Sequence, residues 1–414
     1  MTTTSGTDGA TTVTPPAGTR RLLLAEDTSL AVHLERYGPL PSRVDLVRLL
    51  EQAGLTGHGG AGFPAATKLR GAASRRAGVV IANGAEGEPA SAKDRALLQH
   101  APHLVLDGLL LAARATGARS TYVATPSPQT AEVLREQLAL REQLSVRRGR
   151  LRTEVVVVED RFISGEESAL VNAVEGRPGI PRDRAVPVFE RGVRRQPTLV
   201  HNVETLAHLA LIARFGPAWF RSVGTPEHPG TFLATVSGDV AAPGVHEVEH
   251  GAPLPQLIDA AGGPTAGVQA VLVGGFHGAW VPGASVSSTR MSTSSLAPHG
   301  ASVGAGVVLV LGYDRCGLRE SAGIASYLAG QSAGQCGPCV FGLPRLAQSL
   351  ARLGHPDGDP AVVDEVVRMT ALVRGRGACT HPDGTARFAI STLRAFAEDV
   401  EEHGRGRCRA TPAH

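Results

Sequence analysis

The loop that decides the fold reads Gly57-His58-Gly59-Gly60-Ala61-Gly62-Phe63-Pro64-Ala65-Ala66-Thr67-Lys68. Four glycines within six residues allow a tight turn and let backbone N–H groups approach a ligand with no Cβ in the way. Lys68 can then reach an anionic group held by those amides. The stretch therefore predicts a ligand-binding loop, although it follows a helix and so differs from a dinucleotide G-x-G-x-x-G motif.

Lysine is rare in this chain: Lys68 and Lys93 are its two lysines, which leaves 39 arginines among 41 basic residues. A compact ammonium group is not interchangeable with a planar guanidinium at an anionic site. Both lysines lie in or beside a glycine-bearing loop, which favours a binding role over chance placement.

Composition narrows the class of protein. At 414 residues the chain is long enough for two or three domains, and its net charge of +3 gives no argument for nucleic-acid binding. No run of about 18 apolar residues predicts a direct membrane span. Five cysteines, clustered late, fit a reducing compartment, so we expect a cytoplasmic protein. Residues 1–18 have almost no large apolar side chain, so we expect residues 1–20 to form a disordered tail.

Strand and helix signals alternate after the glycine loop, which predicts an α/β domain. A buried strand over 78–82 runs into a second loop, Asn83-Gly84-Ala85-Glu86-Gly87-Glu88-Pro89-Ala90, before Lys93-Asp94-Arg95 starts a helix. Ligands in such folds sit at the carboxyl ends of the strands. If this loop stood alone, its two glutamates would be interpreted as a solvated acidic turn.

Two further loops change that interpretation. Gly165-Glu166-Glu167 lies at the start of a helix, where acids complement the helix dipole. Asn202-Val203-Glu204-Thr205 opens another helix with amide and hydroxyl side chains. Four loops of this kind in one chain predict a shared ligand pocket.

These four motifs, in their order and spacing, resemble the NADH-oxidising flavoprotein subunit of respiratory complex I. The same module occurs in NAD-reducing hydrogenases and NAD-dependent formate dehydrogenases, and the resemblance runs from about residue 40 to about residue 402. It implies that NADH delivers a hydride near Glu88, the expected catalytic residue. It also implies FMN held by Gly57, Gly59, Gly60, Phe63, Lys68, Asn83, Glu86, Glu88, Gly165, Glu166, Glu167, Asn202 and Thr205.

The resemblance also implies how the chain is divided. An α/β FMN- and NADH-binding domain is expected over 21–229, followed by a β-grasp (SLBB-like, α+β) domain over 230–314, where short alternating strands surround one helix. A helical iron–sulfur domain is expected over 315–403, with Leu343, Leu346 and Leu350 on one buried face, and a tail over 404–414.

The cluster motif departs from the family pattern of three cysteines at Cys-x-x-Cys-x-x-Cys spacing and a fourth about forty residues later. Ala333 occupies the first position, and a methyl group cannot ligate iron, which leaves Cys336, Cys339 and Cys379. The missing ligand of a [4Fe–4S] cluster could be Ser332, His381, water or Cys316. A three-iron cluster, zinc on the three thiols with His381, and an empty site also stay open at this point. Cys408 is expected to be a free surface thiol.

The region expected to bind NADH also departs from the family pattern. The family's adenine-stacking rings would lie just after Lys68, where this chain has Leu69-Arg70-Gly71, and near Arg184-Ala185-Val186-Pro187. Losing two stacking contacts of roughly 0.5–1.5 kcal/mol each weakens dinucleotide binding on the order of tenfold or more. Ala85 and His201 replace a usual acid and a usual asparagine beside the flavin.

The leading hypothesis is an NADH dehydrogenase subunit that oxidises NADH through FMN and passes single electrons through an iron–sulfur cluster. Its expected partner is an external [2Fe–2S] or ferredoxin-like protein, at a position peripheral to a membrane complex. One alternative keeps the flavin but uses a donor other than NADH, such as a ferredoxin. Another is a non-catalytic, zinc-binding relative.

Overall fold

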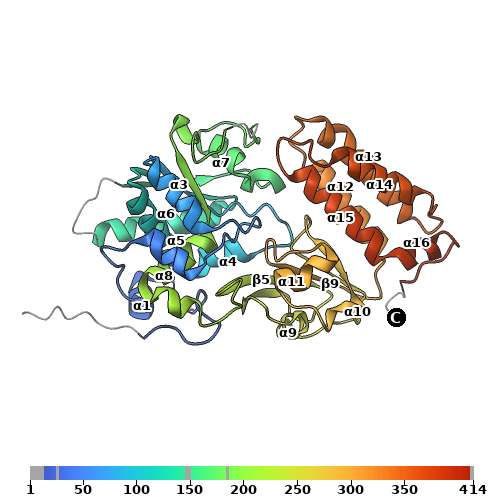
Figure 1. The fold of residues 1–414 in the computed structure, drawn as a ribbon, viewed down its shortest axis with the longest axis horizontal. Coiled ribbons are helices and arrows are strands. Elements are labelled where there is room, and N and C mark those ends of the chain that lie inside the picture. The colour runs from blue at the N-terminus through green and yellow to red at the C-terminus, as the bar shows by residue number, and fades with distance from the viewer. Residues whose placement is uncertain (1–13, 25–27, 145–150, 183–185, 411–414) are drawn as a thin grey trace, which may run out of the picture.

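The computed structural model describes residues 14–24, 28–144, 151–182 and 186–410. Figure 1 shows three parts in chain order: a sheet wrapped by helices, a second sheet below it, and a bundle of helices beside both. This is the predicted combination of an α/β part, a β-grasp part and a helical part. The fold class is confirmed, whereas the residue boundaries of the three domains stay a prediction.

The first sheet is parallel and has the strand order β3-β2-β1-β4. From β1 the chain moves outward to β2 and β3, then returns to the other side of β1 to form β4. The boundary between β1 and β4 is therefore the topological switch point, where open α/β sheets bind ligands. The strands are β1 (Val79–Asn83), β2 (Ser120–Thr125), β3 (Arg152–Val157) and β4 (Thr198–Asn202).

Helices cover both faces of this sheet. On one face Val80 and Leu199 pack against α5 and α8, and on the other Ile81 and Val200 pack against α7. Burial on both faces explains why the central strand β1 reads as an apolar run, Val79-Val80-Ile81-Ala82. The helices are α1 (Leu30–Tyr37), α2 (Leu46–Ala53), α3 (Ala65–Ser74), α4 (Lys93–His100), α5 (Pro102–Thr116), α6 (Pro128–Leu144), α7 (Glu167–Val174) and α8 (Val203–Phe220).

Membrane spans need long, apolar helices. Within the described ranges, no single helix is long and apolar enough to cross a membrane. The pair α4 and α5, bent by 95°, passes on length and composition when counted together. In α5, however, nearly every residue is buried inside the protein, among them Asp107.

The second sheet has the order β6-β5-β9-β7-β8, with β5 and β9 parallel and the other pairs antiparallel. Helix α9 (Leu254–Ala260) packs its buried leucines against this sheet, which is the predicted β-grasp arrangement. The strands are β5 (Thr231–Gly238), β6 (Gly244–Glu249), β7 (Ala270–Val273), β8 (Ala279–Pro282) and β9 (Val307–Leu311), and short helices α10 (Gly283–Val286) and α11 (Thr293–Leu296) lie between β8 and β9.

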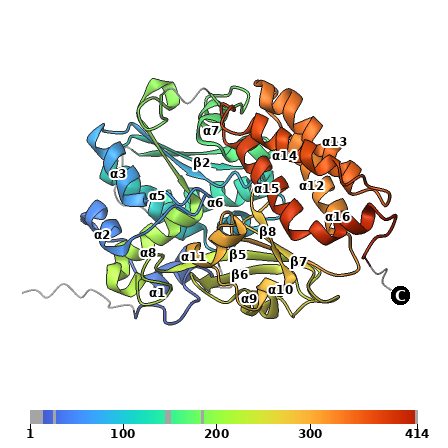
Figure 2. The same cartoon turned by 45° about the vertical axis from the view of Figure 1, so that its right-hand side comes forward.

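The bundle buries the predicted leucine face of α13 and rests on the second sheet (Figure 2). Trp280 of β8 lies 5.3 Å from Phe396, ring centre to ring centre, and its indole N–H donates to Ser321 at 3.0 Å. A Cβ on Gly317 would meet Phe396 at 2.1 Å, so this approach requires glycine. The helices are α12 (Gly317–Gly330), α13 (Leu343–Leu353), α14 (Val362–Val373), α15 (His381–Ala395) and α16 (Ala397–His403).

The N-terminal segment is held against the end of α8. The carbonyl of Pro16 accepts a hydrogen bond from the Trp219 indole at 2.9 Å, and the buried guanidinium of Arg21 donates to the carbonyl of Phe220 at 3.1 Å. These two bonds anchor residues 16 and 21 to the end of α8, and the expected disordered tail over residues 1–20 stays a prediction. Residues 1–13 lie outside the described part of the chain.

Asp107 is a charge inside the apolar helix α5. Its carboxylate accepts a hydrogen bond from His33 at 2.8 Å and pairs with Arg141 and Arg214. Burial alone would raise the pKa of Asp107, but the His33 bond and the two guanidinium charges hold that pKa well below its usual range. The ionised group ties α1, α5, α6 and α8 together.

We predict that Asp107→Asn lowers the free energy of unfolding by about 3–5 kcal/mol, because Arg214 is left buried without its counter-charge. Chemical denaturation followed by circular dichroism measures this. The matched control is Glu132→Gln, which removes an exposed ion pair with Arg135 and should change stability by about 0.5 kcal/mol or less. Equal effects of the two substitutions would contradict the role given to Asp107.

Candidate functional site

The predicted loops meet at the switch point of the first sheet. Asn83 ends β1 and Asn202 ends β4, and the two residues face each other in register. The Asn202 amide donates to the Asn83 carbonyl at 3.3 Å and to the Asp94 carboxylate at 2.7 Å, while its oxygen accepts from the backbone N–H of Glu204. One side chain thus fixes the second loop, the start of α4 and the start of α8.

The glycine loop lies over the start of α8. The backbone N–H of His58 donates to the Thr205 hydroxyl at 2.9 Å, and a Cβ on Gly59 would lie 3.5 Å from the Asn202 Cβ. Gly60 has a φ of +96°, a conformation that favours glycine. Phe63 leaves the loop with half of its surface exposed. The structure therefore brings the glycine loop, Asn202 and Thr205 together, as predicted.

The third loop, Gly165-Glu166-Glu167, is in direct contact with the second loop, residues 83–90. The Asn83 amide donates to the carbonyl of Gly165 at 2.9 Å, and its oxygen accepts from the backbone N–H of Ala85 at 3.1 Å. A Cβ on Gly165 would lie 2.7 Å from the Ala85 carbonyl oxygen. Only glycine fits this contact, so Gly165 lets the two loops share one wall of the site.

Two of the predicted carboxylates cap helices. Glu86 accepts hydrogen bonds from the backbone N–H groups of Asp94 and Arg95 at the start of α4, at 3.0 and 3.2 Å. Glu166 is the N-cap of α7 and accepts from the backbone N–H groups of Ser168 and Ala169. Both carboxylates thus complete helix N-termini, and this geometry fixes the loops on either side of the site.

Lys68 and Glu167 form an ion pair between α3 and α7, and both side chains reach solvent. The buried His201 lies beside them; burial and the Lys68 charge lower its pKa to about 3, so its ring is neutral. Its Nε2 has no hydrogen-bond partner among the described residues. An unpaired buried nitrogen beside a lysine fits a polar or anionic ligand in this place.

Glu88 links the second loop to the second sheet. Its carboxylate accepts from the backbone N–H of Phe276 at 2.7 Å and from that of Ala90 at 3.2 Å. A Cβ on Gly275 would lie 2.4 Å from the same carboxylate. Burial raises the pKa of Glu88 to about 7, so the group changes charge near neutral pH.

Sequence reasoning missed the buried hub of the site, Glu204, although the residue stood inside a quoted motif. Its carboxylate lies 3.1 Å from His58 Nδ1 and 2.9 Å from Lys93 Nζ, and it accepts from the backbone N–H of Leu233 at 2.7 Å. Burial would raise the pKa of Glu204, but the charges of Lys93 and His58 hold it well below its usual range. The rarity of lysine pointed to Lys93, and no local signal pointed to its partner.

The three cysteines expected to ligate metal converge at one end of the bundle. Cys336 follows α12, Cys339 lies in the π-helical turn η4 (Pro338–Gly342), and Cys379 precedes α15. Burial, with Cys336 and Cys379 close by, raises the pKa of the Cys339 thiol to about 12, and the Ser332 hydroxyl hydrogen-bonds to it. The donor set is thus three thiols and one hydroxyl.

Zinc on the three thiols would need a fourth ligand, and His381 is committed elsewhere. Its Nε2–H donates to the Leu328 carbonyl at 2.8 Å, so the lone pair of the ring lies on Nδ1, where it accepts from the Nε2–H of His277 at 3.1 Å. The structure therefore does not present His381 to the thiols as a zinc ligand.

Cys316 is also wrong as a fourth ligand of this group. It precedes α12, whose 14 residues span about 21 Å, and the three thiols lie beyond the other end of that helix. Its neighbours are instead His403 and Cys408. Cys408 is in no disulfide and is partly exposed, as expected for a free surface thiol, and it also hydrogen-bonds to Cys316.

Residues 161–162 contact both the second loop (residues 83–90) and the segment before Cys336. A Cβ on Gly87 would lie 2.5 Å from the carbonyl oxygens of both Arg161 and Phe162. From the same two residues, the Arg161 side chain donates to the Ser332 carbonyl at 3.1 Å and the Phe162 N–H to the Gln331 side chain at 3.1 Å. Residues 161 and 162 thus lie between the second loop and residues 331–339, which we call the cysteine loop.

The first of the two places where an adenine-stacking ring is missing lies in α3. Leu69 is fully buried in the core, and Arg70 pairs with Glu51 on the surface. Arg184 and Ala185 lie outside the described residues. The exposed ring nearest in sequence to the glycine loop is Phe63.

Models of known protein families match three segments of the chain. Residues 50–211 match the Nuo51 FMN-binding domain, residues 233–275 the SLBB domain, and residues 320–403 the NADH-ubiquinone oxidoreductase-F iron-sulfur binding region. These segments follow the order of the three parts of the fold.

Whole-chain comparisons agree. The F subunit of NADH-quinone oxidoreductase from Streptomyces coelicolor is 31% identical over 393 residues, covering 89% of this chain and 85% of the relative. The F 2 subunit of the Rhizobium meliloti enzyme is 30% identical over 382 residues, covering 87% and 88%. A solved NAD+-reducing [NiFe]-hydrogenase in the H2-reduced state matches with a TM-score of 0.79 and 30% identity, over 89% of this chain and 63% of the hydrogenase chain. The chain belongs to the family of NADH-quinone oxidoreductase F subunits.

Proposed function

We propose that this chain oxidises NADH with FMN and passes single electrons through an iron–sulfur cluster to a separate protein. Family membership supports the reaction and both cofactors. The observation that carries the proposal is the contact made by residues 161–162, which places the cysteine loop next to the glycine-bearing loops. A short separation is what single-electron transfer between two groups requires.

The glycine loop and Lys68 would hold the anionic and polar parts of FMN, because backbone amides without Cβ atoms and a lysine converge there. His201 would supply a neutral ring nitrogen to the same ligand. FMN, when bound, accepts a two-electron hydride and releases electrons singly. Around it we place Gly57, Gly59, Gly60, Phe63, Lys68, Asn83, Glu88, Gly165, Glu167, Asn202 and Thr205, with Glu86 and Glu166 fixing the loops as helix caps.

Glu88 would act on NADH. Its carboxylate keeps lone pairs beyond the two backbone hydrogen bonds it accepts. Because its pKa is raised to about 7, it is neutral below that pH and negative above it. A negative charge stabilises the positive charge that develops on a nicotinamide as its hydride leaves.

Cys336, Cys339 and Cys379 would ligate the cluster. Ala333 removes the usual fourth thiolate, and the Ser332 hydroxyl or water takes that place in our proposal. A π-helical turn such as the one carrying Cys339 is frequent at functional sites.

The partner would dock beside this cluster. A groove of about 570 Å³ lies next to Cys339 and is lined by the exposed Phe341 together with Arg345, Arg368 and Arg376. Arg345 is already paired with Glu365, so Arg368 and Arg376 beside the apolar centre supply the positive charge that complements an acidic surface. We propose a [2Fe–2S] or ferredoxin-like protein there, in the cytoplasm and at the periphery of a membrane complex.

The direct test is anaerobic purification followed by titration with NADH. We expect about one FMN per chain, with flavin absorbance that NADH bleaches at a rate that stopped-flow mixing can follow. Bleaching by a reduced ferredoxin but not by NADH would overturn NADH as the donor. One zinc with neither flavin nor iron would overturn the enzyme assignment.

The bleaching rate also tests Glu88. In the wild type it should rise as the pH passes upward through about 7, because Glu88 becomes charged. Glu88→Gln stays neutral, so we expect its rate at pH 8 to fall about ten- to a hundredfold below the wild type while FMN remains bound. Identical pH profiles for the two proteins would remove Glu88 from the reaction.

Iron analysis and electron paramagnetic resonance test the cluster. We expect about three to four irons per chain and a signal after reduction, both lost in Cys336→Ser. Ala333→Cys restores a thiolate, so its cluster should survive air exposure longer and give an altered signal. The matched control Cys408→Ser lies outside the site and should keep the wild-type signal. Full iron content in Cys336→Ser would contradict the ligand assignment.

A further inference from the structure

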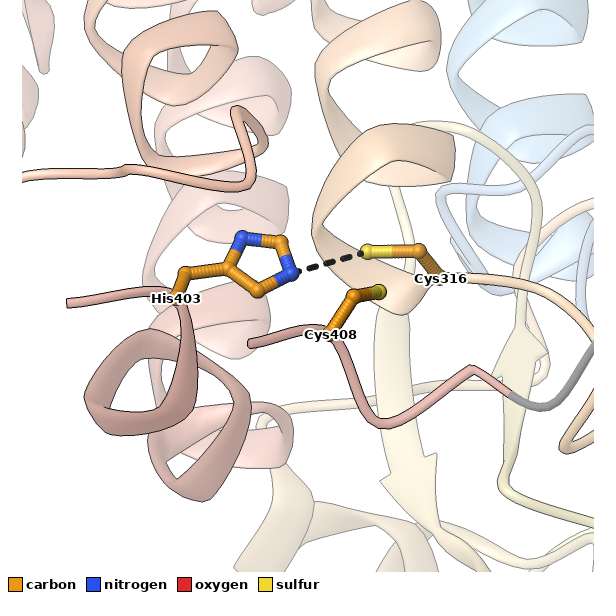
Figure 3. A group of neighbouring side chains, drawn as sticks. All are labelled: Cys316, His403 and Cys408. Atoms are coloured by element: carbon orange, nitrogen blue, oxygen red, sulfur yellow. Dashed lines mark hydrogen bonds between the residues drawn. The ribbon is translucent and has the colours of Figure 1, made fainter. Parts of the chain in front are cut away.

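A second group of metal-ligand side chains, drawn in Figure 3, lies at the opposite end of α12 from Cys336 and Cys339. Cys316 precedes α12, His403 ends α16, and Cys408 belongs to the segment that follows α16. The two sulfurs and one ring nitrogen all lie within 4.8 Å of one another. Three segments of the chain thus turn soft ligand atoms toward one point.

The His403 ring is oriented as in a metal ligand. Its Nδ1 lies 2.8 Å from the carbonyl oxygen of Leu353, which accepts the N–H of that nitrogen. Nε2 then carries a lone pair, and it lies 3.6 Å from the Cys316 sulfur. A histidine that ligates a metal characteristically donates its other N–H to a carbonyl or carboxylate in this way. The ring is almost fully buried, so packing fixes it as well.

The separation of the Cys316 sulfur and the His403 ring nitrogen matches a tetrahedral zinc ion. With Zn–S near 2.3 Å and Zn–N near 2.05 Å, two ligands of one zinc lie about 3.6 Å apart from sulfur to nitrogen. That is the separation of Cys316 and His403. Two thiolates with one imidazole are donors that select zinc over magnesium or calcium.

Another group of potential ligands does not compete. His58, Glu204 and His208 also lie within 4.8 Å of one another. The Glu204 carboxylate, however, already binds the Lys93 ammonium and the backbone N–H of Leu233. A lysine charge 2.9 Å from the other oxygen of the same carboxylate repels a second cation.

We propose that Cys316, His403 and Cys408 bind a zinc ion that staples the C-terminal segment to the bundle. Cys408 is partly exposed, so water can take the fourth position. The ion would hold the start of α12, the end of α16 and the segment that follows together. Its free energy of binding would then contribute to the stability of the folded chain.

The test is a metal titration of the full-length chain, stripped of metal with a chelator, in the Cys336→Ser background, which removes the iron chromophore. Addition of cobalt(II) should produce thiolate-to-cobalt charge transfer and tetrahedral visible bands at about one cobalt per chain, and zinc should displace it. Adding Cys408→Ser should weaken cobalt binding at least about tenfold and change the ligand-field bands. Wild-type protein should contain about one zinc per chain, lost in Cys408→Ser while its iron stays.

Thermal stability supplies a second readout, and it needs no substitution of the buried Cys316 or His403. Cys408 lies in a surface segment, so Cys408→Ser should fold, and a chelator should lower Tm in the Cys336→Ser protein but not in the double variant. Equal cobalt binding with and without Cys408, or no stoichiometric cobalt in either, would overturn the proposal. So would a native disulfide between Cys316 and Cys408 found by mass spectrometry.

Discussion

The buried carboxylate of Glu204 is the constraint on which the loop site depends. Glu204 lies in the first turn of α8, and its carboxylate reaches the glycine loop through His58, α4 through Lys93 and the second sheet through Leu233. Burying an ionised group is costly, and the cost is offset only when its partners supply opposite charge and hydrogen bonds in good geometry. Because those partners lie on different segments, the segments must assemble before the charge is satisfied.

Glycine provides the second constraint, which is close approach. Gly87 and Gly165 let the second and third loops touch backbone to backbone, and Gly275 leaves room for the Glu88 carboxylate. Hydrogen bonds from Arg161 to Ser332 and from Phe162 to Gln331 then bring the cysteine loop against residues 161–162. The glycine-bearing loops, the second sheet and the helical bundle are therefore in direct contact. A side chain on any of these glycines would push the contacting segments apart.

Much of the fold and of the loop site could be predicted from the sequence, because the patterns that indicate them are local. Alternating strands and helices, glycine-bearing loops and the Cys-x-x-Cys spacing each depend on neighbouring residues. The roles of Glu86 and Glu166 could not be separated locally, since a carboxylate before a helix suits both a ligand and a cap. The contacts of Glu204 with His58 and Leu233, and the meeting of Cys316 with Cys408, depend on long-range packing that leaves no spacing pattern.

The most direct measurement is the FMN affinity of Glu204→Gln, followed by quenching of flavin fluorescence. Glutamine keeps the shape of the side chain but removes the charge that holds His58 and Lys93. We expect the folded variant to bind FMN at least about tenfold more weakly than the wild type, and the exposed-site control Glu227→Gln to bind it normally. Wild-type affinity in Glu204→Gln would contradict the claim that this carboxylate assembles the flavin loops.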